Sequence, residues 1–130
     1  TGSRFPNRSR TIVCPSTQEL NRRKKEFLEA SGLQVLNISG PEVAKNSDKR
    51  KLPWHLPYTE AKKASLEFPQ ADGILIPCGS WNSGPEVVEF LERDLGKPVI
   101  TSQQAFIWAG LKALKIKEPV NCFGKLLRTL

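Results

Sequence analysis

The sequence contains no methionine, and among its 130 residues it has only one histidine, one tyrosine and three cysteines. A translated chain normally opens with methionine, so we expect this sequence to be processed or to be a piece of something longer. With one histidine and no Cys-x-x-Cys spacing, the sequence argues against a zinc site, and we expect no metal. Three widely spaced cysteines argue against a disulfide framework and favour a reducing, cytoplasmic compartment.

Long apolar segments and nucleotide-binding motifs are also missing. The longest uncharged apolar run, Gly73–Pro77, is far too short to span a bilayer, so we expect no membrane partner. The chain has neither a P-loop nor a Gly-x-Gly-x-x-Gly motif, which leaves nucleotide cofactors without support. The residues that are present, 38% hydrophobic and 25% charged, are typical of globular domains and exclude wholesale disorder.

Positive charge exceeds negative charge, with 20 lysines and arginines against 13 aspartates and glutamates and a net charge of +7. Such a balance suggests nucleic acid or an acidic ligand as a partner. The densest basic run, residues 22–25, occupies successive positions of a predicted helix and therefore surrounds it instead of forming a stripe. No aromatic residues are interleaved with the basic runs. We therefore do not expect a nucleic-acid partner.

From residue 11 onward, short apolar runs alternate with amphipathic helical stretches. This alternation predicts a parallel sheet with helices on both faces, an α/β fold. Residues 1–10 are predicted to be a tail or connector, and residues 11–130 an α/β lobe. A long loop is predicted over residues 39–57. The predicted strands are Thr11–Cys14, Leu33–Ile38, Gly73–Pro77 and Pro98–Thr101.

Capping residues mark where the helices are expected to begin. Ser16 and Glu19 have the spacing of a capping box before the first helix, whose inner face is predicted to include Leu20 and Phe27. Ser102 is predicted to cap the helix that follows the last strand.

Cys78 is the best placed reactive group, because ligands of parallel α/β sheets meet the loops that follow the strands. It ends the most apolar strand and is followed by Gly79 and Ser80 before a helix begins. A thiol that faces helix-start amides has a lowered pKa, and those amides and the Ser80 hydroxyl could receive a carboxylate. The alternative is a buried cysteine that behaves as a small hydrophobic residue.

Three further groups have less distinctive surroundings. His55, in the predicted long loop, is either a base for Cys78 or a surface histidine. Cys14 ends the first predicted strand and Cys122 lies in the irregular tail. We interpret both cysteines as structural.

Several segments together resemble the second half of the Asp/Glu racemase superfamily. The segment of residues 71–80, Ala-Asp-Gly-Ile-Leu-Ile-Pro-Cys-Gly-Ser, carries most of the resemblance, with Glu86–Leu95 and Gly96–Ser102 after it. Residues 11–28 and 123–127 continue it in both directions. Maleate cis-trans isomerase and arylmalonate decarboxylase are the most similar branches. The resemblance implies a flavodoxin-like lobe, one of two in a pseudo-symmetric fold with the substrate in the cleft between them.

The same resemblance implies site residues. Cys78 matches the second-half catalytic cysteine, and Gly79 and Ser80 match the residues whose amides hold a substrate carboxylate. Asn46 matches a substrate-contacting asparagine of the isomerase branch. Ser16 stands where the family has a tyrosine and is our candidate for substrate binding at that position.

The implied chemistry is cofactor-independent isomerisation, racemisation or decarboxylation at a carbon next to a carboxylate, with a cysteine as acid/base or nucleophile. The substrate would be a small carboxylate or dicarboxylate, and a matching N-terminal half, or a second copy in a homo-oligomer, would complete the site. The alternative is a non-catalytic α/β domain that binds an acidic partner through its basic surface.

Overall fold

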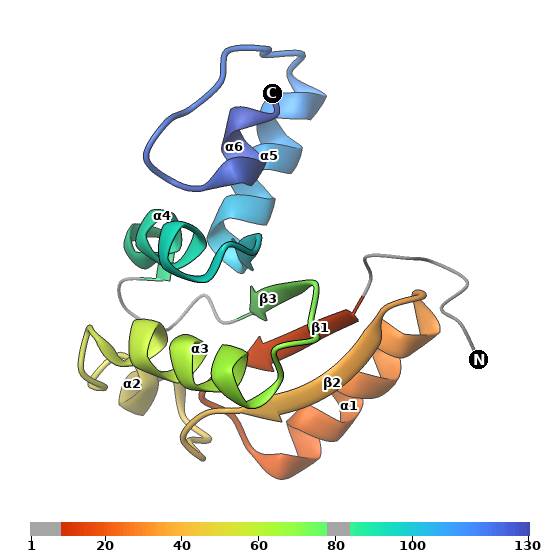
Figure 1. The fold of residues 1–130 in the computed structure, drawn as a ribbon, viewed down its shortest axis with the longest axis vertical. Coiled ribbons are helices and arrows are strands. Elements are labelled where there is room, and N and C mark those ends of the chain that lie inside the picture. The colour runs from red at the N-terminus through yellow and green to blue at the C-terminus, as the bar shows by residue number, and fades with distance from the viewer. Residues whose placement is uncertain (1–8, 78–83) are drawn as a thin grey trace.

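A four-stranded parallel sheet forms the centre of the fold in the computed structural model, which describes residues 9–77 and 84–130 (Figure 1). The spatial order of its strands is β2-β1-β3-β4. This sheet confirms the predicted α/β class. The strands are β1 (Ser9–Val13), β2 (Gln34–Ser39), β3 (Gly73–Ile76) and β4 (Val99–Thr101).

Helices connect the strands and cover the sheet. The chain moves one way along the sheet from β1 to β2 and the opposite way from β2 to β3 and on to β4, so right-handed crossovers place α1 on one face and α3 and α4 on the other. The helices are α1 (Gln18–Ala30), α2 (Asn46–Lys49), α3 (Leu56–Glu67), α4 (Gly84–Leu95), α5 (Ser102–Ala113) and α6 (Lys125–Arg128). Figure 1 shows α5 and α6 together at the end of the molecule opposite α1. Within residues 9–77 and 84–130, no helix is both long and apolar enough to cross a membrane.

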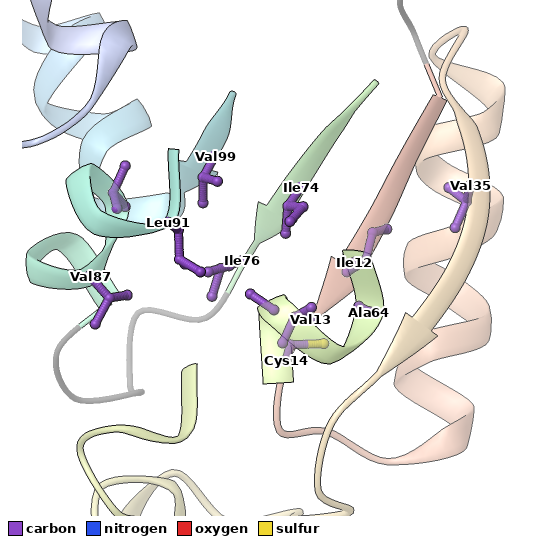
Figure 2. Close-up of a cluster of buried hydrophobic side chains, with 12 residues drawn as sticks. Ile12, Val13, Cys14, Val35, Ala64, Ile74, Ile76, Val87, Leu91 and Val99 are labelled. Carbon is purple, nitrogen blue, oxygen red and sulfur yellow. The ribbon is translucent and has the colours of Figure 1, made fainter. Parts of the chain in front are cut away.

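The hydrophobic core lies where the strands meet α3 and α4 (Figure 2). Ile12 and Val13 are both fully buried, although neighbouring side chains of a strand point to opposite faces. Covering both faces of β1 is what a parallel sheet between two helical layers requires. From α4, Leu91 reaches the same cluster as Ile76 of β3.

Two helix starts differ from the sequence prediction. Thr17, not Ser16, caps α1, and its hydroxyl accepts a hydrogen bond from the Leu20 amide at 3.3 Å. Thr101, not Ser102, caps α5 in a capping box with Gln104. In both cases the residue one position from the predicted cap has the extended backbone that a cap needs.

The predicted inner face of α1 is wrong for Leu20 and Phe27. Leu20 is 39% exposed and Phe27 is 71% exposed. Inside the helix, only Asn21, Lys24 and Leu28 are half-buried. Their spacing of three and four residues forms one stripe, so the sheet meets a narrow and partly polar face of α1.

The segments that the sequence predicted as loop and tail contain further short helices. α2 lies inside the predicted loop of residues 39–57, and α6 lies in the C-terminal region predicted to be irregular. The first strand begins at Ser9, two residues before the predicted start, because Ser9 and Arg10 pair with Gln34 and Val35 of β2.

Gly40 lets the loop after β2 pack directly on the end of β1. Its φ angle is +136°, and a Cβ atom at this position would lie 2.2 Å from the carbonyl oxygen of Cys14. Two hydrogen bonds fix the approach, from the Cys14 amide to the Ser39 carbonyl at 2.9 Å and from the Ser16 amide to the Pro41 carbonyl at 3.1 Å. The loops after β1 and β2 therefore form one continuous surface at the carboxyl edge of the sheet.

Candidate functional site

The carboxyl ends of β1 and β3 lie side by side in the centre of the sheet. Ile12 is level with Leu75, and two residues further along each chain Cys14 and Pro77 follow the last residue of their strands. Adjacent strands are about 4.8 Å apart, so the loops that leave these two ends start close together. This edge is where an open α/β sheet binds its ligands.

A polar cluster of four side chains forms where β1 ends, and we call it the β1-end cluster: Cys14, Ser16, Asn21 and Lys24. The Lys24 ammonium donates to the Ser16 hydroxyl at 3.3 Å and to the Cys14 sulfur at 3.4 Å. The Cys14 thiol also lies 3.6 Å from Oδ1 of Asn21. Figure 2 shows Cys14 directly after the arrowhead of β1.

The residues of the β1-end cluster differ in exposure. Cys14 and Ser16 are buried, with 1% and 3% of their surface exposed, whereas Asn21 and Lys24 are half-buried. The ammonium therefore reaches two buried acceptors, the Cys14 sulfur and the Ser16 hydroxyl. Within the described residues it forms no ion pair with a carboxylate.

The predicted site residues fall in different parts of the molecule. Cys78, Gly79 and Ser80 lie outside the described residues. Ser16 is at the end of β1, buried and bonded to Lys24. Asn46 is the first residue of α2 and is exposed.

His55 is exposed at the N-terminal end of α3, with its ring edge-on to Trp54 at a centroid distance of 6.3 Å. This exposure agrees with the interpretation of His55 as a surface histidine. Cys14 and Cys122 are thiols, one buried and one exposed.

An apolar hollow of about 390 Å³ lies beside the carboxyl ends of β3 and β4. Leu75 and Pro77 line it from the sheet, and Ala105, Phe106 and Ala109 line it from α5. The wall is apolar but remains in contact with solvent, because Phe106 is 79% exposed. A non-polar surface and a polar cluster thus both lie along the carboxyl edge of the sheet.

Comparison with known families agrees with this arrangement. The family model described as arylmalonate decarboxylase matches residues 7–127. The chain belongs to the arylmalonate decarboxylase family. The resemblance of the sequence to the isomerase and decarboxylase branches of the Asp/Glu racemase superfamily is thereby confirmed.

Individual members of the family have been characterised. The chain is 28% identical over 117 residues to maleate isomerase of Nocardia farcinica (strain IFM 10152), which covers 90% of this chain and 46% of that enzyme. A mutant of the Nocardia farcinica maleate cis-trans isomerase with a covalently bound succinylcysteine intermediate has a TM-score of 0.84 at 27% identity, covering 93% of this chain and 49% of the other. Unliganded arylmalonate decarboxylase has a TM-score of 0.81 at 21% identity, covering 92% and 52%. The last likeness concerns the fold alone.

The chain spans about half the length of these relatives. Their other half has no counterpart in the 130 residues. The sheet described above accordingly corresponds to one half of the larger fold, as the sequence predicted.

Sequence reasoning missed Lys24, because it treated residues 22–25 as one solvated run around a helix. What distinguishes Lys24 is its place on the half-buried stripe of α1. Lys24 lies three residues after Asn21 and four before Leu28, which puts it on their stripe, whereas Arg22, Arg23 and Lys25 are exposed.

Proposed function

We propose that this chain is one lobe of a cofactor-independent enzyme that isomerises, racemises or decarboxylates a small carboxylate or dicarboxylate, with Cys78 as its thiol. The observation that carries the proposal is cysteine chemistry in a relative that shares the fold at a TM-score of 0.84: a mutant in which one cysteine is replaced by serine holds a covalently bound succinylcysteine on another cysteine. A cysteine thiolate that adds to the double bond of maleate forms this adduct. The sulfur bonds to one alkene carbon, the displaced electron pair moves toward the neighbouring carboxylate, and a proton added to the other alkene carbon completes the succinyl group.

The chemistry of such an adduct explains why no cofactor is needed. Once the double bond has become a single bond, the carbons can rotate, and removal of the added proton with expulsion of the thiolate then restores the double bond in the other geometry. In a racemase or decarboxylase the thiol instead moves a proton to or from the carbon next to the carboxylate. In each case hydrogen-bond donors must stabilise negative charge that spreads onto carboxylate oxygens.

Cys78 is assigned to this role from its position in the chain. It follows Pro77 directly after β3, the strand whose carboxyl end is beside that of β1. Gly79 and Ser80 come next and are proposed to hold a substrate carboxylate through their amides. Ser16 and Asn46, at the loops after β1 and β2, are proposed to contact the substrate.

The opposing catalytic group belongs to a second lobe, because the chain covers only about half of the relatives it matches. A matching half of a longer protein or a second copy of this chain would supply it. Assembly with such a lobe is part of the proposed function.

A binding domain for an acidic partner is the second candidate, and the net charge of +7 favours it. Part of that charge is locally neutralised on α1. Arg22 forms ion pairs of 2.7 Å with both Glu19 and Glu26, and Arg23 lies 3.3 Å from Glu19. The exposed face of α1 is therefore less basic than its sequence.

The test compares Cys78→Ser with the wild type in assays of maleate isomerisation and arylmalonate decarboxylation. We expect Cys78→Ser to lower kcat by roughly 100- to 10,000-fold, the range over which one positioned acid, base or nucleophile contributes. Cys122→Ser is the matched control, since this exposed thiol lies in the C-terminal tail, and it should retain activity.

Full activity in Cys78→Ser would remove Cys78 from the proposed role. A wild-type protein that turns over neither substrate but binds acidic polypeptides would favour the second candidate.

A further inference from the structure

We infer that Lys24 is a carboxylate-binding residue, which holds one carboxylate of the small substrate at the end of β1 and so helps to select anionic substrates. The inference rests on the proposed function and deepens it. Neither the position of Lys24 in the sequence nor its basic neighbours marks it out. The contacts of its ammonium distinguish Lys24 from the other basic residues of α1.

The first observation is the direction of the side chain. Four consecutive basic residues occupy positions 22–25, and Lys24 alone among them is half-buried. Its ammonium reaches the carboxyl end of β1, where it bonds Cys14 and Ser16. A lysine stem that packs over a helix stripe and delivers its charge to a strand end has a fixed location, unlike a solvated lysine.

The second observation is the absence of a counter-charge. On the same helix, Arg22 and Arg23 each pair with glutamate. Among the described residues, the partners of Lys24 are a neutral hydroxyl and a thiol. An ammonium has three hydrogen-bond donors, so these two acceptors leave one donor for a ligand.

The third observation is the location of this charge relative to the expected chemistry. Lys24 meets Cys14, and Cys14 lies level with Pro77 in the parallel register of β1 and β3. The chain passes from Pro77 into Cys78. A cation at the neighbouring strand end is suited to attract a carboxylate and to stabilise negative charge that develops on it.

A carboxylate-binding lysine and a purely structural lysine differ in their response to small anions. A structural lysine would be insensitive to small anions. A carboxylate-binding lysine should change its chemical reactivity when the anion is present, and its loss should raise KM more than it lowers kcat. Arginine should replace it in part, because it keeps the charge but places it in a planar fork.

The experiment measures two quantities on the full chain, assembled with its second lobe where one is required. The first is the rate of acetylation of each lysine by an activated acetate ester, followed by mass spectrometry, with maleate or with neutral maleamide added. We expect maleate to slow acetylation of Lys24 several-fold and to leave Lys25 unchanged, and maleamide to affect neither. Lys25 is an internal control of equal charge on the adjacent, exposed position.

The second quantity is the KM for maleate, or its Kd where turnover is slow. We expect Lys24→Met to raise it about 10- to 100-fold, the contribution of one charged hydrogen bond, with Lys24→Arg between Lys24→Met and the wild type. Lys25→Met should change it less than about twofold, because an exposed charge is screened.

The outcomes separate this inference from the proposed function. Turnover with an equal KM in Lys24→Met and wild type would overturn the role of Lys24 and leave the enzyme standing. Protection of Lys24 by maleate in a protein that turns over neither substrate would support the carboxylate site and overturn the enzyme. Equal protection of Lys24 and Lys25 would show a general salt effect and overturn the inference, as would protection of neither.

Discussion

Charged side chains at the two edges of the central sheet have different kinds of partner. At the amino edge, the Asp72 carboxylate accepts hydrogen bonds from the Ser9 hydroxyl at 2.7 Å and from the Ser9 amide at 3.0 Å. At the carboxyl edge, the Lys24 ammonium meets no carboxylate among the described residues and donates to the Ser16 hydroxyl and the Cys14 sulfur. The Asp72 carboxylate is bonded by groups that folding brings to it, whereas the Lys24 ammonium keeps one hydrogen-bond donor for a ligand.

This contrast distinguishes a structural polar contact from one prepared for a ligand. Asp72 joins the start of β1 to the turn before β3, and its two contacts are made by one residue 63 positions away. Hydrogen bonds from the Ser9 hydroxyl and, next, from its amide lower the pKa of Asp72. In the β1-end cluster, the Lys24 ammonium has two acceptors, the Ser16 hydroxyl and the Cys14 sulfur, for its three donors. We therefore expect the functional site at the carboxyl edge, where no carboxylate among the described residues pairs with Lys24.

The largest effect is expected from Gly40→Ala, which attacks the carboxyl edge. A methyl group there would collide with the Cys14 carbonyl, and a positive φ angle is unfavourable for alanine. We expect a loss of about 3 kcal/mol in the free energy of unfolding, measured by urea denaturation. Gly110→Ala is the control, because it has open space within α5 and should be neutral or stabilising.

Equal stability of Gly40→Ala and wild type would mean that the loops after β1 and β2 are not packed together. The loops at the carboxyl edge would then not hold the β1-end cluster in a fixed position, and its contrast with the Asp72 contacts at the amino edge would no longer hold.

An intermediate effect is expected at the amino edge from Asp72→Asn. A carboxylate whose folded pKa lies below its unfolded value of about 3.9 stabilises the fold above that value, and this contribution is lost as the pH falls through the folded pKa. We therefore expect Asp72→Asn to be less stable than wild type at pH 7 and the difference to close in acid. Urea midpoints measured between pH 7 and pH 2 give the profile.

Ser9→Ala provides the partner variant for this prediction. It removes the hydroxyl donor but keeps the amide, so it should reproduce part of the loss. A difference between Asp72→Asn and wild type that is the same at every pH would assign the effect to packing instead of charge.

The smallest effect on stability is expected from Lys24→Met. No carboxylate loses its partner, and the methionine stem can cover the same stripe of α1. We expect the free energy of unfolding to change by less than about 1 kcal/mol, measured by thermal and urea denaturation. A loss above about 2 kcal/mol would show that Lys24 is a structural contact like Asp72.

The sequence predicted the architecture well, because parallel strands that are buried on both faces appear in a sequence as short apolar runs. The predicted ranges of β2 and β3 agree with the structure to within one residue at each end. The Cys78 segment was recognised from local sequence. Its catalytic role stays a prediction.

Other features could not be predicted from local patterns. The sequence favoured Ser16 as the cap of α1, but its hydroxyl is bonded by Lys24, eight residues away, and Thr17 takes the capping role. Phe27 was expected to face inward and is exposed, while Lys24 faces the sheet. Hydrophobicity alone predicts a buried Phe27 and an exposed Lys24.

The sequence by itself determined the α/β class, the order of strands and helices along the chain, and the family to which the chain belongs, since these follow from periodicity and short motifs. Only the tertiary structure decided which cation of α1 meets the carboxyl edge and which remains in solvent. The reason is that α1 contacts the sheet through one narrow stripe. Its rotation is set by packing against β2, which exists only once the strands have assembled.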